Sequence, residues 1–413
     1  MKKNLLKITL LLFVAASFTA CKKDDSSDYF NDLKLPENTG TVVTGQNEFA
    51  FNLFNRQLQT ESTNSNVLIS PLSVYLALAM AYNGADGQTK AAIEQALAIK
   101  GTTIDDVNKV CQAIVTQMPQ EDGKVALSIA NSVWYTNQKD APLNSFLEAT
   151  STYFKATSKG LDFTSPSAVS TINNWASANT KGKIEQIIDK INDGEIMFLI
   201  NAIYFYGSWK NGFNPSNTHN DIFYAADKSQ PSVSFMSEEF TSNYIRSDSY
   251  SGVELPYGSG KGFSMYVMMP LDANQSIRDF AASFDLNAFA ENLQNANSSK
   301  FLITIPKWEY SYSVKDFKDI LSDMGMGDAF SGNANFSKMY SFPMHLTRVV
   351  HKTYIKVSED GTVAAAVTAV GGGATSVGPP REFKLNHPFL YLIVEKQTGS
   401  ILFAGAVNDP SKH

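Results

Sequence analysis

The residue types that carry most enzyme chemistry are present in this chain, but their spacing assembles no catalytic site. Among 413 residues there are five histidines and two cysteines, in neither a His-Glu-x-x-His nor a Cys-x-x-Cys spacing, so the strong zinc motifs are absent. The glycine-rich stretch 258–262 (GSGKG) lacks the phosphate-loop and Gly-x-Ser-x-Gly patterns and is typical of a hairpin turn. Adjacent carboxylates such as Glu238 and Glu239 are expected to be splayed apart and solvated. We therefore expect no enzymatic activity, no metal and no cofactor.

One segment has the composition of a loop that can become a strand. Residues 358–369 read SEDGTVAAAVTA, in which Glu359 and Gly361 precede a run of only small or β-branched side chains. Successive side chains of a strand point to opposite faces, so alternate residues of the run could slide beneath other layers without steric clash. These alternate residues are Thr362, Ala364, Ala366 and Thr368. Taken alone, this composition favours an ordinary surface loop.

The neighbouring sequence instead favours a loop that can become a strand. Residues 349–357 alternate like a strand that leads into the segment, and residues 383–394 and 398–405 are typical of two buried strands around a turn. This arrangement resembles the hinge, the reactive loop and the C-terminal strands of the serpins.

Further motifs in family order extend the resemblance over nearly all of the chain after its leader. They are NVLISPLS at 66–73 with ALAMAYNGA at 77–85, INNW at 172–175 with TKGKI at 180–184, LINAIYFYGSWK at 199–210, IPKW at 305–308 and MGMGDAFS at 324–331. A helix-rich first half and a strand-rich second half indicate one α+β domain. The resemblance implies the serpin fold: a single domain with three β-sheets, about nine helices and an exposed reactive-centre loop between Glu359 and Pro379.

Charge and cysteine content limit the partners of the chain. A net charge of −6 and a pI near 5.5, with no concentrated Lys/Arg stretch in the globular part, argue against nucleic acid, whose phosphates require a basic face. Cys111 lies in an amphipathic stretch and is expected to be a small core residue. We expect a monomer.

The N-terminus has the pattern of an export signal. Three lysines precede a short apolar run at residues 8–16, and Cys21 directly follows Ala20. This pattern resembles a lipoprotein-type signal peptide over residues 1–20 with a lipidated Cys21; an ordinary signal peptide is the alternative. A polar tether over 21–45 and a serpin domain over 46–413 would follow. We expect an exported outer-membrane lipoprotein held to the membrane by Cys21. The stretch 22–25 (KKDD) resembles a tag for cell-surface exposure.

The resemblance implies an inhibitor that acts as a suicide substrate. A target serine protease attacks a loop bond and forms an acyl-enzyme, and the freed hinge inserts into the main sheet before water releases the acyl group. The hinge residues are Glu359, Gly361, Thr362, Ala364, Ala366 and Thr368, with neither proline nor charge from Thr362 onward to impede insertion. A serpin-fold protein that no longer inhibits, such as a decoy substrate, carrier or chaperone, is the alternative.

Two further groups of residues match positions that control sheet opening in the family. Ser70, Ser73, Asn201 and His351 match a buried polar cluster, the shutter, beneath the main sheet. Trp209, Tyr257, Lys307 and Glu359 match the breach at the top of that sheet. A core histidine without a gating role and an exposed ion pair of little energetic value are the respective alternatives.

The scissile bond is inferred by counting. Serpins usually place it thirteen residues after the first hinge residue, which gives Thr375-Ser376; Ala374, Ser376 and Val377 remain alternatives for the residue before the cut. All are small or uncharged, so a shallow apolar specificity pocket fits them better than a charged one. We therefore expect elastase-like or subtilisin-like targets, with cysteine proteases as a further class.

Replacing Thr375 by arginine should shift inhibition from elastase-like toward trypsin-like proteases, because an anionic specificity pocket then gains a charge partner. The hinge is unchanged, so the complex should remain covalent. Mass spectrometry of the released C-terminal peptide locates the bond, and a peptide beginning at Ser376 supports the count. Cleavage of the wild type only after Arg381, with no trapped elastase-like enzyme, would contradict both the site and the target class.

Overall fold

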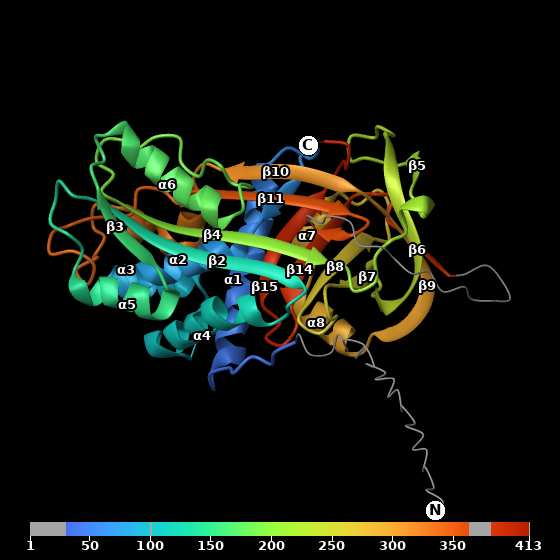
Figure 1. Cartoon of the computed structure of the whole chain (residues 1–413), viewed down its shortest axis with the longest axis horizontal. Coiled ribbons are helices and arrows are strands. Elements are labelled where there is room, and N and C mark those ends of the chain that lie inside the picture. The colour runs from blue at the N-terminus through green and yellow to red at the C-terminus, as the bar shows by residue number, and fades with distance from the viewer. Residues whose placement is uncertain (1–29, 100, 363–380, 413) are drawn as a thin grey trace, which may run out of the picture.

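The structure, a computed structural model, describes residues 30–99, 101–362 and 381–412 of the chain. Within these ranges there are nine α-helices and two hydrogen-bonded sheets (Figure 1). The helices are α1 (Thr39–Thr60), α2 (Pro71–Gly84), α3 (Gly87–Ala96), α4 (Ile104–Gln117), α5 (Asn144–Phe154), α6 (Pro166–Asn179), α7 (Ile277–Ser283), α8 (Leu286–Gln294) and α9 (Lys318–Leu321).

Local sequence sets several of the helix ends. At the start of α2, the Ser70 side chain accepts a hydrogen bond from the Ser73 N–H at 3.3 Å, and Pro71 occupies the first helical position, where no backbone donor is needed. Helix α4 begins with a reciprocal capping box between Thr103 and Asp106. These caps satisfy backbone N–H groups that have no partner within the helix.

A six-stranded sheet runs lengthwise across the molecule, with α6 in front of it and α1 and α2 behind it (Figure 1). Its strands, in spatial order, are β10 (Trp308–Val314), β11 (His351–Ser358), β12 (Gly361–Thr362), β4 (Met197–Ser208), β2 (Val125–Thr136) and β3 (Thr157–Leu161). β2 and β4 pair antiparallel along nearly their whole length, from Val125↔Gly207 to Tyr135↔Met197. These two strands give the sheet a rigid half against which the hinge can be placed.

The remaining strands form one continuous set that includes the third sheet predicted from the family resemblance. In spatial order they are β1 (Val67–Ile69), β15 (Ile401–Val407), β14 (Phe389–Glu395), β8 (Phe263–Pro270), β7 (Tyr250–Pro256), β6 (Ser232–Arg246), β9 (Asn297–Pro306) and β13 (Glu382–Lys384), with β5 (His219–Ile222) also paired to β6. Only the last residues of β6 pair with β7, whereas its earlier part pairs with β5 and β9. The group β5, β6, β9 and β13 is thus a separate layer joined to the rest through one long strand.

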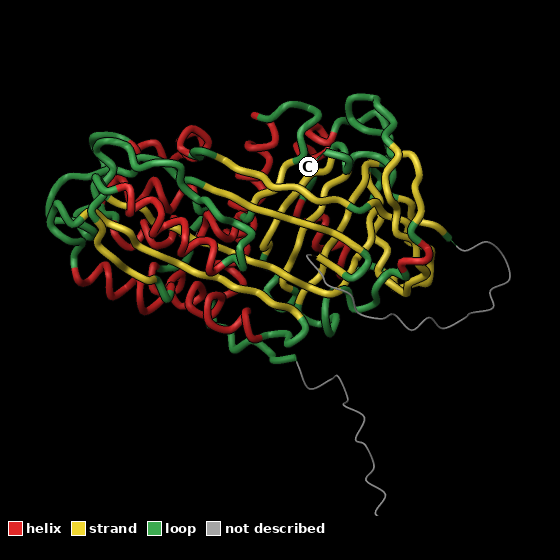
Figure 2. Tube along the Cα trace, turned by 45° about the horizontal axis from the view of Figure 1, so that its top comes forward, coloured by secondary structure: helices red, strands yellow, loops and turns green. Residues whose placement is uncertain are grey.

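The core lies between the two sheets, and α2 is buried there along almost its whole length. A pair of tyrosines also crosses between the sheets: the hydroxyls of Tyr310 in β10 and Tyr391 in β14 lie 2.9 Å apart, and Tyr310 donates to the Val67 carbonyl at 3.0 Å. Figure 2 shows the strands of the two sheets crossing behind and in front of one another.

The polar tether predicted over residues 21–45 ends earlier than residue 45. Helix α1 begins at Thr39, and Val42 and Val43 are buried. Gly45 suggests a turn in the sequence, but a Cβ there would lie 2.5 Å from the Ala98 carbonyl oxygen, so the glycine permits close packing instead. Residues 30–38 also contact the domain and belong to it. Cys21 lies outside the described residues. Within the described ranges, no helix combines the length and apolarity needed to cross a bilayer.

Candidate functional site

The first hinge residues form the two-residue strand β12 at the top of the six-stranded sheet. Thr362 pairs with Gly207 of β4 on one side and with Val357 of β11 on the other. Gly361 has a φ of 143°, and a Cβ there would lie 2.1 Å from the Gly207 carbonyl oxygen, so only glycine fits. Thr362 is 2% exposed. The start of the hinge thus already lies within the sheet.

Two aromatic residues hold this start of the hinge from below. The Tyr257 hydroxyl lies 2.6 Å from the Thr362 hydroxyl, and the Tyr257 ring stacks on Trp209 with centroids 4.6 Å apart and an interplanar angle of 14°. Trp209 Nε1 donates to the Ser358 carbonyl at 2.9 Å. Burial raises the pKa of Tyr257, so its hydroxyl stays protonated and available to bond Thr362. Loop residues on both sides of Gly361 are therefore tied to one aromatic pair.

Glu359 is held by two partners from different elements. Lys307 Nζ lies 2.9 Å from Glu359 Oε2, and the Thr218 hydroxyl donates to Glu359 Oε1 at 2.8 Å. Partial burial alone would raise the pKa of Glu359, but the hydrogen bonds from Lys307, the backbone and Thr218 outweigh it and lower the pKa below its usual value. The Lys307–Glu359 ion pair is partly exposed, so it contributes little free energy to folding. Its main effect is to fix the position of Glu359.

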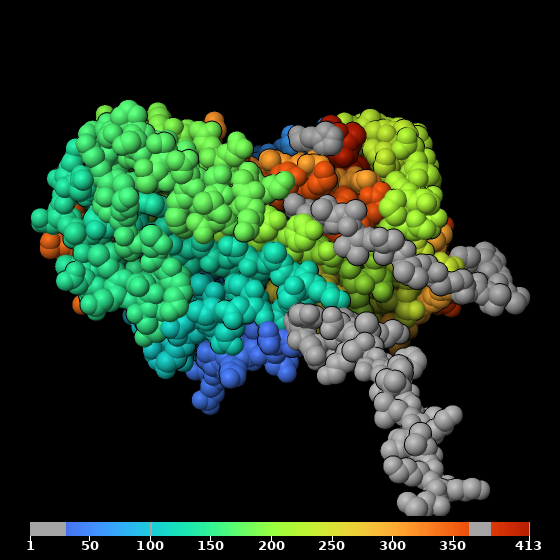
Figure 3. Space-filling model, in the orientation of Figure 1, coloured from blue at the N-terminus to red at the C-terminus, as the bar shows by residue number. Residues whose placement is uncertain are grey.

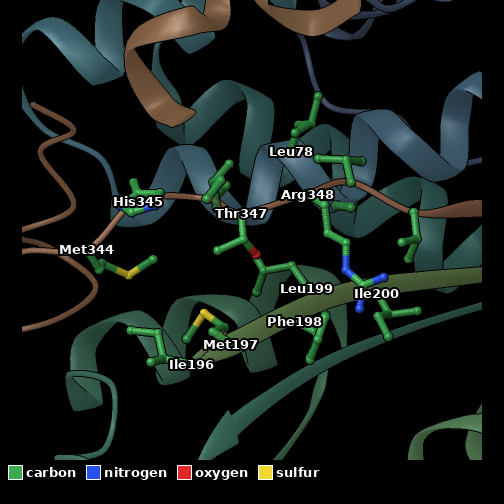
Figure 4. A pocket seen from close by; sticks show the side chains of 15 residues that line it. Leu78, Ile196, Met197, Phe198, Leu199, Ile200, Met344, His345, Thr347 and Arg348 are labelled. Carbon is green, nitrogen blue, oxygen red and sulfur yellow. The ribbon is translucent and has the colours of Figure 1, made fainter. Parts of the chain in front are cut away.

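Below β12, the gap between β4 and β11, here called the seam, is not closed by strand pairing. No backbone hydrogen bond among the described residues joins these two strands directly. A cavity separates residues 203–205 of β4 from Tyr354 of β11, with Phe403 as its floor. A second pocket lies at the lower end, among Leu78 of α2, Leu199 of β4 and Met344 before β11 (Figure 4). Under-filled space therefore borders the seam at two separate levels, beside residues 203–205 and beside residues 196–200 of β4.

The four shutter residues lie together around the seam, but they do not form one closed network. The Ser70 N–H donates to His351 Nε2 at 2.9 Å, and the Ser73 hydroxyl donates to the Asn201 carbonyl at 3.3 Å. Asn201 Nδ2 donates to Asn131 Oδ1 at 2.8 Å, whereas the buried Asn201 Oδ1 has no hydrogen-bond partner among the described residues. Within those residues no hydrogen bond joins His351 to Asn201, because the two lie on opposite sides of the seam.

The protonation state of His351 follows from its surroundings. Burial lowers the pKa of this histidine to about 3, so the imidazole is neutral near pH 7. Since Nε2 accepts from the Ser70 N–H, the single ring proton resides on Nδ1. A second proton would remove the acceptor and place an unpaired charge in the core.

Some predicted positions fall outside the described residues, and some contacts were not predicted. The predicted positions that lie outside the described residues include the hinge residues Ala364, Ala366 and Thr368 and the proposed bond Thr375-Ser376. The contacts that were not predicted include those of Thr218 and Asn131; no local motif marks these two residues, because the partner of each lies far away in the sequence. Lys183, whose ammonium lies 4.8 Å from the Tyr354 ring centroid over the seam, was not predicted either.

Comparison with known proteins agrees with this geometry. The family model described as serpin (serine protease inhibitor) matches residues 44–410. An uncharacterized serpin-like protein of Methanosarcina mazei is 32% identical over 98% of this chain and 97% of its own length, and Serpin B6 of Pongo abelii is 31% identical over 88% and 97%. The native structure of the thermophilic serpin tengpin superposes with a TM-score of 0.81 at 32% identity, covering 92% of this chain and 97% of tengpin.

The chain belongs to the serpin family. The serpin fold predicted from the motif order is confirmed, and serpins are mostly protease inhibitors rather than enzymes. In this serpin the breach residues lie around Thr362, and the shutter residues lie on both sides of the seam. Their functional roles stay predictions.

Acidification should destabilise this serpin through His351. The unfolded histidine binds a proton below about pH 6.5, whereas the folded one does not until about pH 3, so folding stability falls as pH drops between those values. From pH 7 to pH 5 the loss from this residue is about 2 kcal/mol. Urea unfolding of wild type and His351→Gln at both pH values measures it.

The exposed His345 provides the matched control. His345→Gln should keep the pH dependence of the wild type, while His351→Gln should show a flatter one. Equal slopes for His351→Gln and the wild type would mean that His351 does not control acid stability.

Proposed function

We propose that this serpin inhibits serine proteases as a suicide substrate, by inserting its cleaved reactive loop into the seam between β4 and β11. The observation that carries the proposal is β12: the hinge enters the sheet at Thr362, and no direct strand pairing among the described residues closes the seam beyond it. A strand that begins there can be extended by the residues that follow in the chain.

The pairing register of β12 predicts which residues of β4 and β11 would flank each inserted hinge residue. Each further hinge residue moves one position down β4 and β11, because both pairings are antiparallel. Ala364 would then lie between Phe205 and Ile355, and Ala366 between Ile203 and Thr353. These flanking side chains of β4 and β11 are buried, so small alanines at the inward positions fill the space without clash.

The same register places Thr368 between Asn201 of β4 and His351 of β11. Directly opposed residues of an antiparallel sheet point to the same face, so the threonine hydroxyl would enter the shutter. Asn201 Oδ1 is the buried acceptor that has no hydrogen-bond partner among the described residues, and a threonine hydroxyl can donate to it. Insertion would thus satisfy a polar atom that the present arrangement leaves unbonded.

The reach of the loop is compatible with this mechanism. From Thr362 to Thr375 are fourteen residues, which span roughly 45 Å when extended. A new central strand of that length would form about a dozen ladder hydrogen bonds, worth on the order of 10 kcal/mol before packing is counted. Such a gain outweighs the rearrangement of a few side-chain contacts in the breach.

The remaining parts of the proposal rest on sequence. Small residues around Thr375-Ser376 favour elastase-like or subtilisin-like proteases, with cysteine proteases as a further class. The pattern before Cys21 supports export and a lipid anchor at that residue, with the domain displayed as a monomer on the outer membrane or cell surface. No nucleic acid, metal or cofactor is part of the proposed mechanism.

Ala364→Arg should convert the inhibitor into a substrate of pancreatic-type elastase. On insertion the β12 register would place this residue at an inward position between Phe205 and Ile355, where burying a charged side chain costs several kcal/mol, so insertion slows and hydrolysis of the acyl bond prevails. Denaturing electrophoresis after mixing with elastase measures the ratio of covalent complex to cleaved inhibitor.

Val363→Arg is the matched control, because residue 363 alternates to the opposite face of an inserted strand. We expect this variant to retain most of its covalent complex. Undiminished complex with Ala364→Arg would contradict insertion along the β12 register, and absence of any complex with the wild type would favour a decoy, carrier or chaperone.

A further inference from the structure

A buried pair of carboxyl groups lies far from the hinge machinery, beneath the first described residues. Glu121, after the short turn Met118–Gln120 that follows α4, and Glu395, at the end of β14, both have 0% exposure. Gln397 bonds to both carboxyl groups, with its backbone N–H to Glu395 Oε1 and its side-chain Nε2 to Glu121 Oε1, so the two carboxyl groups lie side by side. Two carboxylates cannot both be ionised at that separation without strong repulsion, so one of them must carry a proton.

The hydrogen bonds decide which of the two holds the proton. Glu395 accepts from the backbone N–H groups of Gln397 and Thr398 and from the Thr398 hydroxyl, an arrangement that suits a carboxylate. Glu121 Oε1 accepts one bond, from Gln397 Nε2 at 2.9 Å, and its buried Oε2 meets no donor among the described residues. Glu121 Oε2 is therefore the oxygen of the pair that could carry a proton and donate it to Glu395.

Residues 30–34, within the range first predicted to be a tether, bond to the domain beside this pair. We call residues 30–34 the strap; it lies next to the start of α1, which appears blue at the lower edge of Figure 3. The Asn31 N–H donates to the Glu121 carbonyl at 2.8 Å, and the Leu33 N–H donates to Gln397 Oε1 at 3.1 Å. Gln397 thus bonds the strap with its carbonyl and Glu121 with its amide N–H. Strap, Gln397, Glu121 and Glu395 form one chain of hydrogen bonds.

The other charged groups around the pair are already engaged. Asp122 accepts from the Ser259 N–H and hydroxyl, at 2.8 and 2.6 Å. Lys396 pairs with Glu254 at 2.7 Å and also donates to the Gly260 carbonyl. Lys261 of the same hairpin lies 5.5 Å from the ring of Phe30 in the strap. None of these charges is bonded to the Glu121 carboxyl, so among the described residues no cation takes the place of a proton at the pair.

We propose that Glu121 and Glu395 share a single proton at neutral pH, and that this protonated pair holds the strap against the domain so that alkaline pH releases it. Burial and the neighbouring Glu395 carboxylate raise the pKa of Glu121 far above its usual value. Loss of the proton leaves two buried negative charges in contact, and the hydrogen-bonded chain that supports the strap opens. The device does not depend on loop insertion or on a lipid at Cys21.

Glu121→Gln is the variant that separates this account from ordinary packing. Its amide N–H can donate permanently to Glu395 and its carbonyl can still accept from Gln397, so the strap should stay docked in alkali. Asp32→Asn, an equally conservative change at an exposed carboxylate of the strap itself, is the control and should behave as the wild type. Glu395→Gln should destabilise the protein, because its amide nitrogen would replace an oxygen that accepts one or two of these three bonds.

Millisecond hydrogen exchange of the Asn31 and Leu33 amides in the full chain, corrected for the intrinsic rate at each pH, measures docking. Wild type and Glu121→Gln should show equal protection near pH 7. Beyond the pH at which the shared proton is lost, wild-type protection should fall about tenfold per pH unit relative to Glu121→Gln. Equal protection of the two proteins up to about pH 10.5 would overturn the proposal.

Two further measurements keep the test decisive if Glu121→Gln folds poorly. Infrared spectra of the wild type should contain a protonated carboxylic acid band at pH 8 that disappears in alkali, and its absence at pH 8 would also overturn the proposal. The folded pKa is raised, so wild-type stability should decline as pH rises above the unfolded value, while Glu121→Gln should not share that decline.

Discussion

The structure depends on a strand that is begun but not completed. β2 and β4 form one paired half of the main sheet, β10 and β11 form the other, and of the described residues only Gly361 and Thr362 bridge them. Backbone ladders are the main source of directional order in a sheet, so a seam without direct pairing is a position of unrealised stabilisation. The chain carries the missing strand in its own sequence, directly after Thr362.

Two groups of contacts hold β4 and β11 in the arrangement that leaves the seam without direct strand pairing. At the top, Gly361 allows an approach that no side chain could make, and Tyr257 and Trp209 hold the residues around it. Further down, a neutral His351 bonds to the N-terminus of α2, while Asn201 bonds across to Asn131 on the opposite side. Each group is satisfied locally, with Asn201 Oδ1 as the exception among the described shutter atoms. Asn201 Oδ1, the acceptor that an inserted strand could satisfy, therefore lies where the β12 register would place Thr368.

The sequence allowed the fold to be predicted because its motifs occur in family order, and each motif is local. It also indicated Gly361, and it indicated the contact between Lys307 and Glu359 through the family resemblance. Thr218 and Asn131 could not be predicted, because only the folded chain brings them to partners 141 and 70 positions away. The start of the domain was placed too late since residues 30–45 look polar and turn-rich, while their burial comes from contacts with distant segments. Glu121 could not be singled out from the sequence, because what distinguishes it is its position beside Glu395, which only the fold brings about.

The central claim is that the described arrangement is less stable than one in which the loop completes the main sheet. Thermal unfolding of the protein before and after a single cut between residues 371 and 377 tests this claim most directly. The account predicts a clearly higher melting midpoint after cleavage, because the freed hinge can then add a full strand between β4 and β11. An unchanged or lower midpoint would contradict it.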